Sequence, residues 1–181
     1  MDLTGRVEFR MKAMSKGLSA ENIHILILQE KNGTTIFPIP VTEEQNRMIV
    51  AAANPNSSIS LLMDSVRMLV ADGNTIVEGV SVDSIADGEY KANIFANTNG
   101  EESIIPSNAS SAIVMALTLR VPLYVSEQIL QQTHVDMEKQ AFTFPITTLS
   151  TEVLKSALQD AVRKEQYEVA SFLRDELKRR K

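Results

Sequence analysis

Four carboxylates in the first half of the chain could bind a metal ion. They are Asp64, Asp83, Asp87 and Glu89. Carboxylate oxygens are ligands that Mg²⁺ prefers, and a bound metal ion can activate water for hydrolysis. A metal site would require the fold to gather them. Local structure also explains two of them, because Asp87 begins a turn dipeptide with Gly88 and Asp64 falls on the polar side of a predicted helix.

Other catalytic groups are scarce. His24 lies inside an apolar predicted strand, where a hydrogen-bonded core histidine is expected, and His134 follows a predicted helix as an exposed or end-capping residue. The chain has no cysteine, which excludes disulfides, thiolate metal sites and a cysteine nucleophile. No glycine-rich phosphate loop and no G-x-S-x-G elbow are present. The sequence therefore assigns no catalytic residue.

The charge is unevenly distributed along the 181 residues, a length that fits one domain with a small appendage. Residues 151–181 contain eight basic and six acidic residues, and the first 150 contain the remaining 10 basic and 17 acidic residues. The main part therefore has a net charge of −7, which disfavours nonspecific attraction to phosphate backbones but does not exclude a nuclease that holds metal ions. No apolar run is long enough for a membrane span and the N-terminus lacks a secretory signal, so we expect a cytoplasmic protein.

Strands are predicted both before and after a segment of two helices that lies between residues 42 and 71. Alternating polarity predicts a strand over 7–13, and residues 23–28 are apolar on both faces, which indicates a central strand. A hairpin at Asn32-Gly33 leads into 35–39, whose prolines place its end at a sheet edge. The turn dipeptides Asp87-Gly88 and Asn99-Gly100 separate three further strands that form an antiparallel meander. These three are predicted over 75–82, 89–97 and 101–105, and a short strand follows over 123–125.

Helices alternate with these runs of strands. Thr42 and Gln45 match a capping box at the start of a helix that Asn54-Pro55 ends. Further helices are predicted over 58–71, 110–119 and 126–132. This order predicts an α+β fold with a mixed or antiparallel sheet and packed helices.

The last 31 residues predict a separate antiparallel helical hairpin. Apolar residues recur at helical spacing on both sides of Lys164-Glu165-Gln166. Isolated helices of this length are marginal in water, so the hairpin must dock on its own domain, on a second copy or on a partner. The predicted organisation is a domain over 1–135, a linker over 136–150 and the hairpin over 151–181.

Part of the hairpin resembles a known motif. Tyr167-Glu168-Val169-Ala170, followed by Leu173-Arg174-Asp175, is similar to the UVR motif of the bacterial excision-repair proteins UvrB and UvrC and of adaptor proteins of Clp proteases. In that family the hairpin is a protein–protein interaction module. The resemblance therefore implies a partner-binding surface. Its expected residues are Leu158, Tyr167, Ala170, Leu173, Arg174 and Asp175.

The main domain resembles the bifunctional nuclease domain. Three segments carry the likeness, 35–52, 58–82 and 110–130, the last reading SSAIVMALTLRVPLYVSEQIL. The resemblance implies this family's fold and a DNase or RNase activity that uses Mg²⁺ or Mn²⁺. A C-terminal UVR motif is a common companion of this domain, so the two resemblances support each other.

Two charged motifs of that family are missing from the sequence. The family's Arg-Pro-x-Thr-His is replaced by residues 56–60, NSSIS, and its Asp-Ala-Arg-Pro-Ser-Asp-Ala by residues 106–112, PSNASSA. Two hypotheses follow: a metal-dependent nuclease on DNA or RNA, and a degenerate member that acts through its UVR hairpin on itself or on a partner protein. We also expect a homo-oligomer, because the apolar strand 23–28, the edge strand near Pro38 and the hairpin each favour association.

Overall fold

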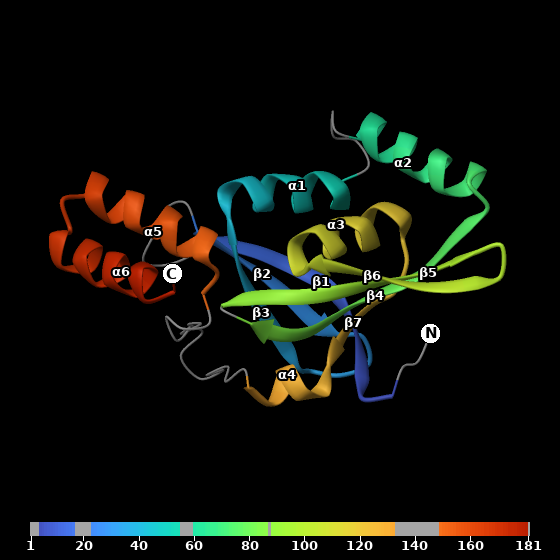
Figure 1. Ribbon diagram of the computed structural model, residues 1–181, viewed down its shortest axis with the longest axis horizontal. Helices are drawn as coiled ribbons and strands as arrows, with labels where there is room; N and C mark the ends of the chain where they lie inside the picture. Colours follow the sequence, from blue (N-terminus) through green and yellow to red (C-terminus); the bar gives the residue numbers. More distant parts are fainter. Residues whose placement is uncertain (1–3, 17–22, 55–59, 87, 133–148, 181) are drawn as a thin grey trace.

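The computed structural model describes residues 4–16, 23–54, 60–86, 88–132 and 149–180. Its centre is a seven-stranded sheet in the order β3-β2-β1-β7-β4-β5-β6 (Figure 1). The strands are β1 (Arg6–Lys16), β2 (Ile23–Glu30), β3 (Ile36–Thr42), β4 (Thr75–Ala86), β5 (Glu89–Thr98), β6 (Glu101–Asn108) and β7 (Leu123–Ser126). Neighbouring strands are antiparallel except β4 and β7, which are parallel. The predicted α+β class and the antiparallel meander are confirmed.

Six helices surround this sheet within the described part of the chain. They are α1 (Glu43–Ala53), α2 (Ser60–Asp72), α3 (Ala109–Leu119), α4 (Glu127–Gln132), α5 (Thr151–Arg163) and α6 (Tyr167–Arg179). Helices α1 and α3 lie over one face of the sheet, α4 lies on the opposite side, and α5 and α6 form a pair at one end of the molecule (Figure 1). No described helix is both long and apolar enough to cross a membrane.

The residues that cap α1 and α3 explain where these helices begin. Thr42 Oγ1 accepts from the backbone N–H of Gln45, and Gln45 Oε1 accepts from the N–H of Thr42, which completes the predicted capping box. Asn108 caps α3 by accepting from the N–H of Ser111 at 2.8 Å. Both helices therefore start at defined positions beside the ends of the strands that precede them.

The core lies between the sheet and helices α1 and α3. Leu26, Leu28 and Phe37 from the first strands are fully buried, as are Ile49 of α1 and Ile113 of α3. The buried aromatic rings meet edge to face, with Phe37 6.4 Å from Phe9 and 5.9 Å from Tyr90 between ring centroids. This is the geometry that aromatic quadrupoles favour.

Tyr90 gives the core a dependence on alkaline pH. Burial raises the pKa of Tyr90 to about 12, from an ordinary value of 10.0. Between these two values the unfolded chain ionises this phenol while the folded chain keeps it neutral. We therefore expect the Tyr90 contribution to the free energy of unfolding, about 2–3 kcal/mol, to be present below pH 10 and lost as the pH rises to about 12. Urea unfolding between pH 9 and 11.5 measures this, and Tyr90→Phe, which has no phenol, is expected to flatten the dependence.

The apolar strand over 23–28 has its hydrogen-bonding and packing partners within one protomer. It forms most of β2, which is hydrogen-bonded to β3 on one side and β1 on the other, so it is internal in the sheet as predicted. Its Leu26 and Leu28 are fully buried. Packing inside the monomer therefore explains the apolar residues of this strand, which had suggested a contact with a second copy of the chain.

Both edge strands contain proline. β3 carries Pro38 and Pro40, and β6 carries Pro106. The Thr98–Glu101 pair closes a two-residue turn, so antiparallel geometry directs the N–H groups of even-numbered β6 residues outward, where Pro106 has none. Proline at an edge is a poor template for further strand pairing. These edges do not support assembly by extension of the sheet.

Candidate functional site

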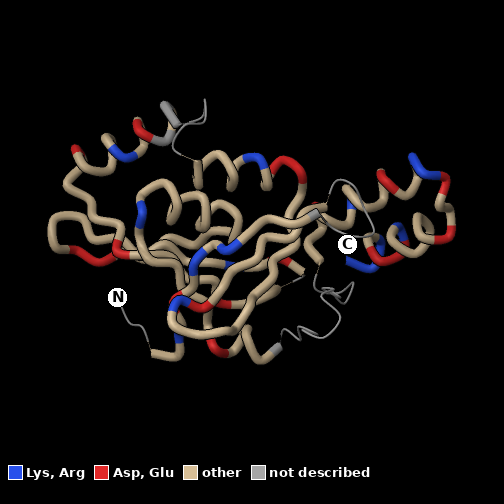
Figure 2. Tube along the Cα trace, turned by 180° about the vertical axis from the view of Figure 1, so that it is seen from behind, with Lys and Arg blue, Asp and Glu red and all other residues tan. Residues whose placement is uncertain are grey.

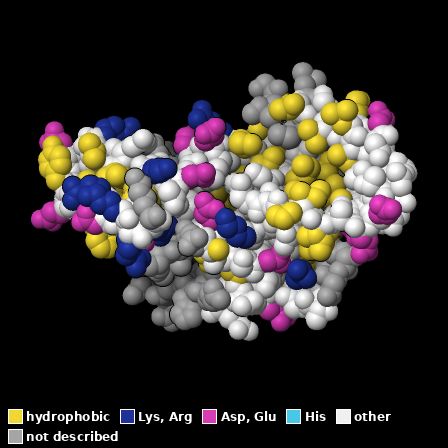
Figure 3. Space-filling view, viewed as in Figure 1, with side chains coloured by type: hydrophobic (Ala, Val, Ile, Leu, Met, Phe, Trp, Pro, Cys, Tyr) yellow, Lys and Arg dark blue, Asp and Glu magenta, His cyan; other side chains and the backbone are white. Residues whose placement is uncertain are grey.

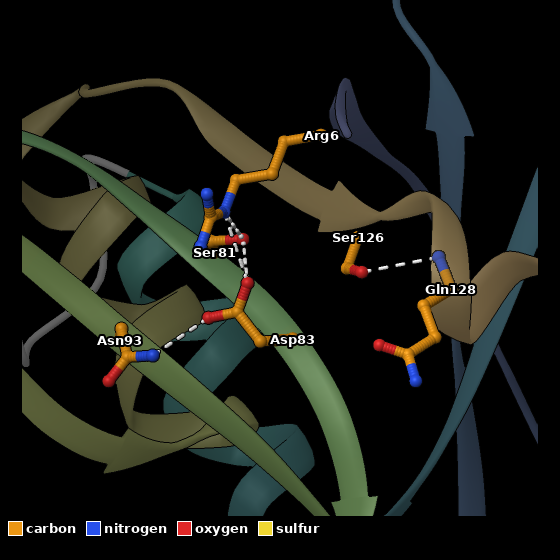
Figure 4. A network of polar contacts seen from close by, with 6 residues as sticks. All are labelled: Arg6, Ser81, Asp83, Asn93, Ser126 and Gln128. Carbon is orange, nitrogen blue, oxygen red and sulfur yellow. Dashed lines mark hydrogen bonds and ion pairs between the residues drawn. The ribbon is translucent and has the colours of Figure 1, made fainter. Parts of the chain in front are cut away.

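Asp83 is held in a polar network on the sheet. Arg6 Nε and Ser81 Oγ both donate to Asp83 Oδ1, at 3.1 and 2.7 Å (Figure 4). Asn93 Nδ2 donates to the other carboxylate oxygen at 2.8 Å. Ser81 is fully buried, and the Arg6 guanidinium lies 5.4 Å from the ring centre of Phe95. A carboxylate with these three donors has a structural role that needs no metal ion.

The other candidate carboxylates lie apart from Asp83. Asp64 is exposed on α2 and pairs with Arg67 at 2.7 Å, and Glu89 at the start of β5 pairs with Lys91. No three His, Cys, Asp or Glu side chains come together as a metal site among the residues that the structure describes. Asp87 and His134 lie outside those residues. The described carboxylates of the sequence-based hypothesis therefore form no shared site.

His24 forms part of the structural core, as expected. It is buried on β2, and its Nε2 atom contacts the carboxylate of Glu43 in the first turn of α1. Arg47, one turn further along the same helix, lies 4.0 Å from the same carboxylate group. The contact of His24 with Glu43 joins the sheet to the beginning of α1 and places Glu43 at the rim of a pocket.

The pocket has a volume of about 620 Å³ and lies where three helices begin. Its walls come from the starts of α1, α3 and α5, whose N-caps are Thr42, Asn108 and Ser150. The lining residues are Thr42, Glu43, Glu44, Gln45, Arg47, Met48, Asn108, Ser110, Ser111, Val114, Glu152 and Ser156. The segment 106–112, which replaces the motif Asp-Ala-Arg-Pro-Ser-Asp-Ala in this sequence, therefore contributes Asn108, Ser110 and Ser111 to the pocket wall.

The chemistry of this pocket is polar with an acidic balance. Its side chains include three glutamates and one arginine, and its α3 wall offers the neutral Asn108, Ser110 and Ser111. Basic and acidic residues are interspersed along the described trace rather than gathered into one basic surface (Figure 2). An acidic balance of this kind opposes the approach of a phosphate backbone unless metal ions compensate for it. Sequence reasoning missed Glu43, Glu152 and Ser156, because they come from helices far apart along the chain.

The C-terminal hairpin has a core of its own. Leu154, Ala157 and Ala161 of α5 are buried against Ala170 and Leu173 of α6, and the half-buried Leu158 packs against this cluster. The buried alanines allow the two helices to approach closely. Three residues expected at a partner surface, Leu158, Ala170 and Leu173, thus lie at the contact between the two helices.

The hairpin tip, defined as Val162, Tyr167, Val169 and Phe172, is exposed. Tyr167 is 68% exposed and Phe172 is 63% exposed. Hydrophobic side chains are visible at this outer end of the molecule and in a second area over α2 (Figure 3). The second area includes Leu62, Met68 and Leu69.

Charged residues flank the hairpin tip. Arg174 and Asp175 pair with each other at 3.1 Å and are both exposed, so the structure leaves this predicted pair at the surface. An apolar patch with exposed charges beside it has the composition of a protein contact surface.

The opposite end of the hairpin contacts the domain, and we call this contact the hairpin base. Gln45 Nε2 donates to Glu152 Oε2 at 3.0 Å, and Ile23 of β2 packs against the cluster between α5 and α6. Within the hairpin, Arg180 Nη1 donates to the carbonyl oxygen of Leu149, which precedes α5. A Cβ atom at Gly88, whose φ is +75°, would lie 2.1 Å from that same carbonyl oxygen. The turn between β4 and β5 therefore needs glycine both for its backbone conformation and for this close approach.

The hairpin base is reinforced by a cluster of opposite charges on α6. Glu176 Oε1 accepts from Arg180 Nε at 2.9 Å, and both carboxylate oxygens of Glu176 accept from Arg179. These hydrogen bonds, from Arg179 and then Arg180, lower the pKa of Glu176. The cluster orients the Arg180 guanidinium toward Leu149.

Comparisons with known proteins agree with both parts of this structure. The family model of the UvrB/uvrC motif matches residues 150–180, which contain α5 and α6. The family model of the bifunctional nuclease domain matches residues 26–138, more than half of the chain. A search of the curated proteins finds no match. The chain is a member of the bifunctional nuclease domain family and carries a UVR motif at its C-terminal end.

Proposed function

We propose that this protein acts through protein–protein contacts made by its UVR hairpin, either with a second copy of itself or with another protein. The observation that carries the proposal is the exposed hairpin tip on a hairpin whose own core is complete. Leu154 and Leu173 are buried inside the pair of helices, whereas Tyr167 and Phe172 on the same pair face outward. Packing within the monomer therefore accounts for the inner stripe but leaves the tip uncovered.

The bifunctional nuclease domain serves in this proposal as a scaffold with reduced chemistry. The segment 106–112 lacks the two aspartates and the arginine of the family motif, and the pocket that it lines contains neutral side chains there. Asp83, one of the candidate carboxylates, accepts hydrogen bonds from Arg6, Ser81 and Asn93. These features favour an interaction role over catalysis.

A test of this proposal measures association with and without the tip. The double variant Tyr167→Ser, Phe172→Ser is expected to weaken self-association in sedimentation velocity, or retention of a partner in a pull-down, by about tenfold or more, because exposed aromatic side chains are common binding hot spots. The matched control is Leu69→Ser, which removes an equally exposed apolar side chain on α2. The proposal is contradicted if the intact protein and the double variant associate to the same extent in both measurements.

A metal-dependent nuclease acting on DNA or RNA is the second candidate function. Membership of the bifunctional nuclease domain family and the pocket at the start of α3 favour it. The test is cleavage of labelled single- and double-stranded DNA and RNA with Mg²⁺ or Mn²⁺, with EDTA as the control. Metal-dependent cleavage that Glu43→Gln or Glu152→Gln abolishes would support a site in the pocket. Absence of cleavage by the purified protein would leave the interaction role as the better account.

A further inference from the structure

We infer that a second, smaller pocket, which we call the inner pocket, binds a primary alkylammonium group. The inner pocket has a volume of about 70 Å³, and it shares Gln45, Asn108, Ser110 and Glu152 with the larger pocket where three helices begin. A space of this size holds a few water molecules or one small headgroup. The inner pocket therefore suits the charged end of a ligand whose remainder lies in the larger pocket.

Tyr90 gives the inner pocket a hydrogen-bonding group without a partner. The residue is 7% exposed, its ring packs edge to face against Phe37, and it lines the inner pocket. Within the part of the chain that the structure describes, its hydroxyl group has no hydrogen-bond partner. The hydroxyl oxygen also keeps some accessible surface, since it is not one of the described polar atoms that are both enclosed and unpartnered. Because a buried phenol usually has a partner, we expect an atom bound in the pocket to supply it.

The charge of the inner pocket selects a cation. Among its described lining residues, Glu89 and Glu152 are acidic and none is basic. Glu89 pairs with Lys91, which lies outside the lining, whereas Glu152 accepts from the neutral amide of Gln45. The charge of Glu89 is therefore balanced, and that of Glu152 is not balanced by any ion pair in the described part of the chain. A ligand with one positive charge at this position complements the pocket.

The groups around Glu152 favour a cation that carries several N–H bonds. Ser110 Oγ donates to Asn108 Oδ1 at 2.8 Å, so its lone pairs remain as acceptors. An ammonium group has three donors and no acceptor, which provides one donor each for Glu152, Ser110 and the phenol oxygen of Tyr90. An anion is disfavoured by the carboxylate of Glu152. A divalent metal ion is disfavoured because the described part of the chain gathers no three acidic or histidine side chains.

Apolar side chains continue from the inner pocket into the larger one. Ile39 and Val41 line the inner pocket, and Met48 and Val114 line the larger pocket. Methylene groups next to the ammonium group would contact these side chains, as the stem of a lysine does on apolar surfaces. The expected ligand is thus a primary amine on an alkyl chain, and both a free polyamine and the lysine side chain of a protein have this chemistry.

Nuclear magnetic resonance of the 181-residue chain with isotope-labelled tyrosine rings tests this inference. The chain has three tyrosines, so the spectrum of Tyr90→Phe assigns the Tyr90 signal. We expect butylammonium to shift this signal in a saturable way. Tetramethylammonium has the same charge but no N–H donor, and we expect it to bind about tenfold more weakly or less, because hydrogen bonds between charged groups are the strong ones.

Substitutions in the inner pocket test the assigned partners. Glu152→Gln and Tyr90→Phe are each expected to weaken butylammonium binding by about tenfold or more, because each removes one partner of a charged donor. Binding to these variants is followed at the backbone amides of Asn108 and Ser110, which line the pocket. Both replacements keep the size of the side chain, and the amide spectrum also shows that each variant is folded.

Two control variants remove the same chemical groups outside both pockets. Tyr124→Phe removes a phenol on β7, and Glu101→Gln removes a carboxylate on β6. Both are expected to leave butylammonium binding unchanged. Comparison of spermidine with Nα-acetyllysine methylamide then shows which source of the amine binds more tightly.

Four results would overturn the inference: no saturable shift with any of these amines, equal affinity for tetramethylammonium and butylammonium, unchanged affinity in both pocket variants, and a shift with Mg²⁺ where the amines give none. The site does not depend on the proposed interaction of the hairpin. The tip variant Tyr167→Ser, Phe172→Ser is expected to bind butylammonium normally, so failure of one proposal is distinguishable from failure of the other.

Discussion

Replacing Leu154 with alanine is expected to reduce the stability of the hairpin by about 2–5 kcal/mol, the usual cost of removing a fully buried leucine side chain. Leu154 is completely buried at the centre of the cluster that joins α5 to α6. Helices of 13 residues have little stability of their own, so this loss is expected to melt the hairpin and leave the sheet folded.

Native-state hydrogen exchange measures the Leu154→Ala effect directly. Amides of α5 and α6 are expected to exchange much faster, whereas amides of β2 and β4 keep their protection. Phe172→Ala is the control, because Phe172 lies on the same hairpin but is exposed, and its cost is expected to stay within about 0.5 kcal/mol. Unchanged exchange in α5 and α6 of Leu154→Ala would show that the shared core does not stabilise the hairpin.

Phe37→Ala is expected to have the largest effect on the main domain, about 3–5 kcal/mol. Phe37 is fully buried and forms edge contacts with both Phe9 and Tyr90, so its loss opens a cavity between β1, β3 and β5. Equilibrium unfolding in urea measures the change. Phe37→Leu fills part of the cavity and is expected to cost less. A cost below about 1 kcal/mol for the alanine variant would contradict the packing described for this core.

The local elements could be predicted because their signals are local. The capping box of Thr42 with Gln45, the turn at Asn99-Gly100 and the apolar stripes of the hairpin each depend on residues a few positions apart. The position of β7 could not be predicted in the same way. This four-residue strand lies between β1 and β4 and is parallel to the latter, and only tertiary packing decides that order.

The pocket could be predicted from the sequence less completely than the fold could. Its pocket joins the starts of three helices that are more than forty residues apart from one to the next along the chain, and no short-range pattern reports that meeting. The sequence identifies Gly88 only as a turn residue, whereas the structure shows the close approach of the Leu149 carbonyl oxygen to it. Asp83 was predicted as a metal ligand because two of its three donors, Arg6 on β1 and Asn93 on β5, come from other strands.

Hydroxyl-radical footprinting of the 181-residue chain, alone and in its associated state, distinguishes the hairpin tip from α2 as the interaction surface. Tyr167 and Phe172 are exposed in the monomer, and Met68 on α2 is an exposed and reactive internal reference. We expect association to protect Tyr167 and Phe172 and to leave Met68 reactive. Protection of Met68 and its neighbours on α2, with Tyr167 and Phe172 still reactive, would contradict the claim that the hairpin tip is the interaction surface.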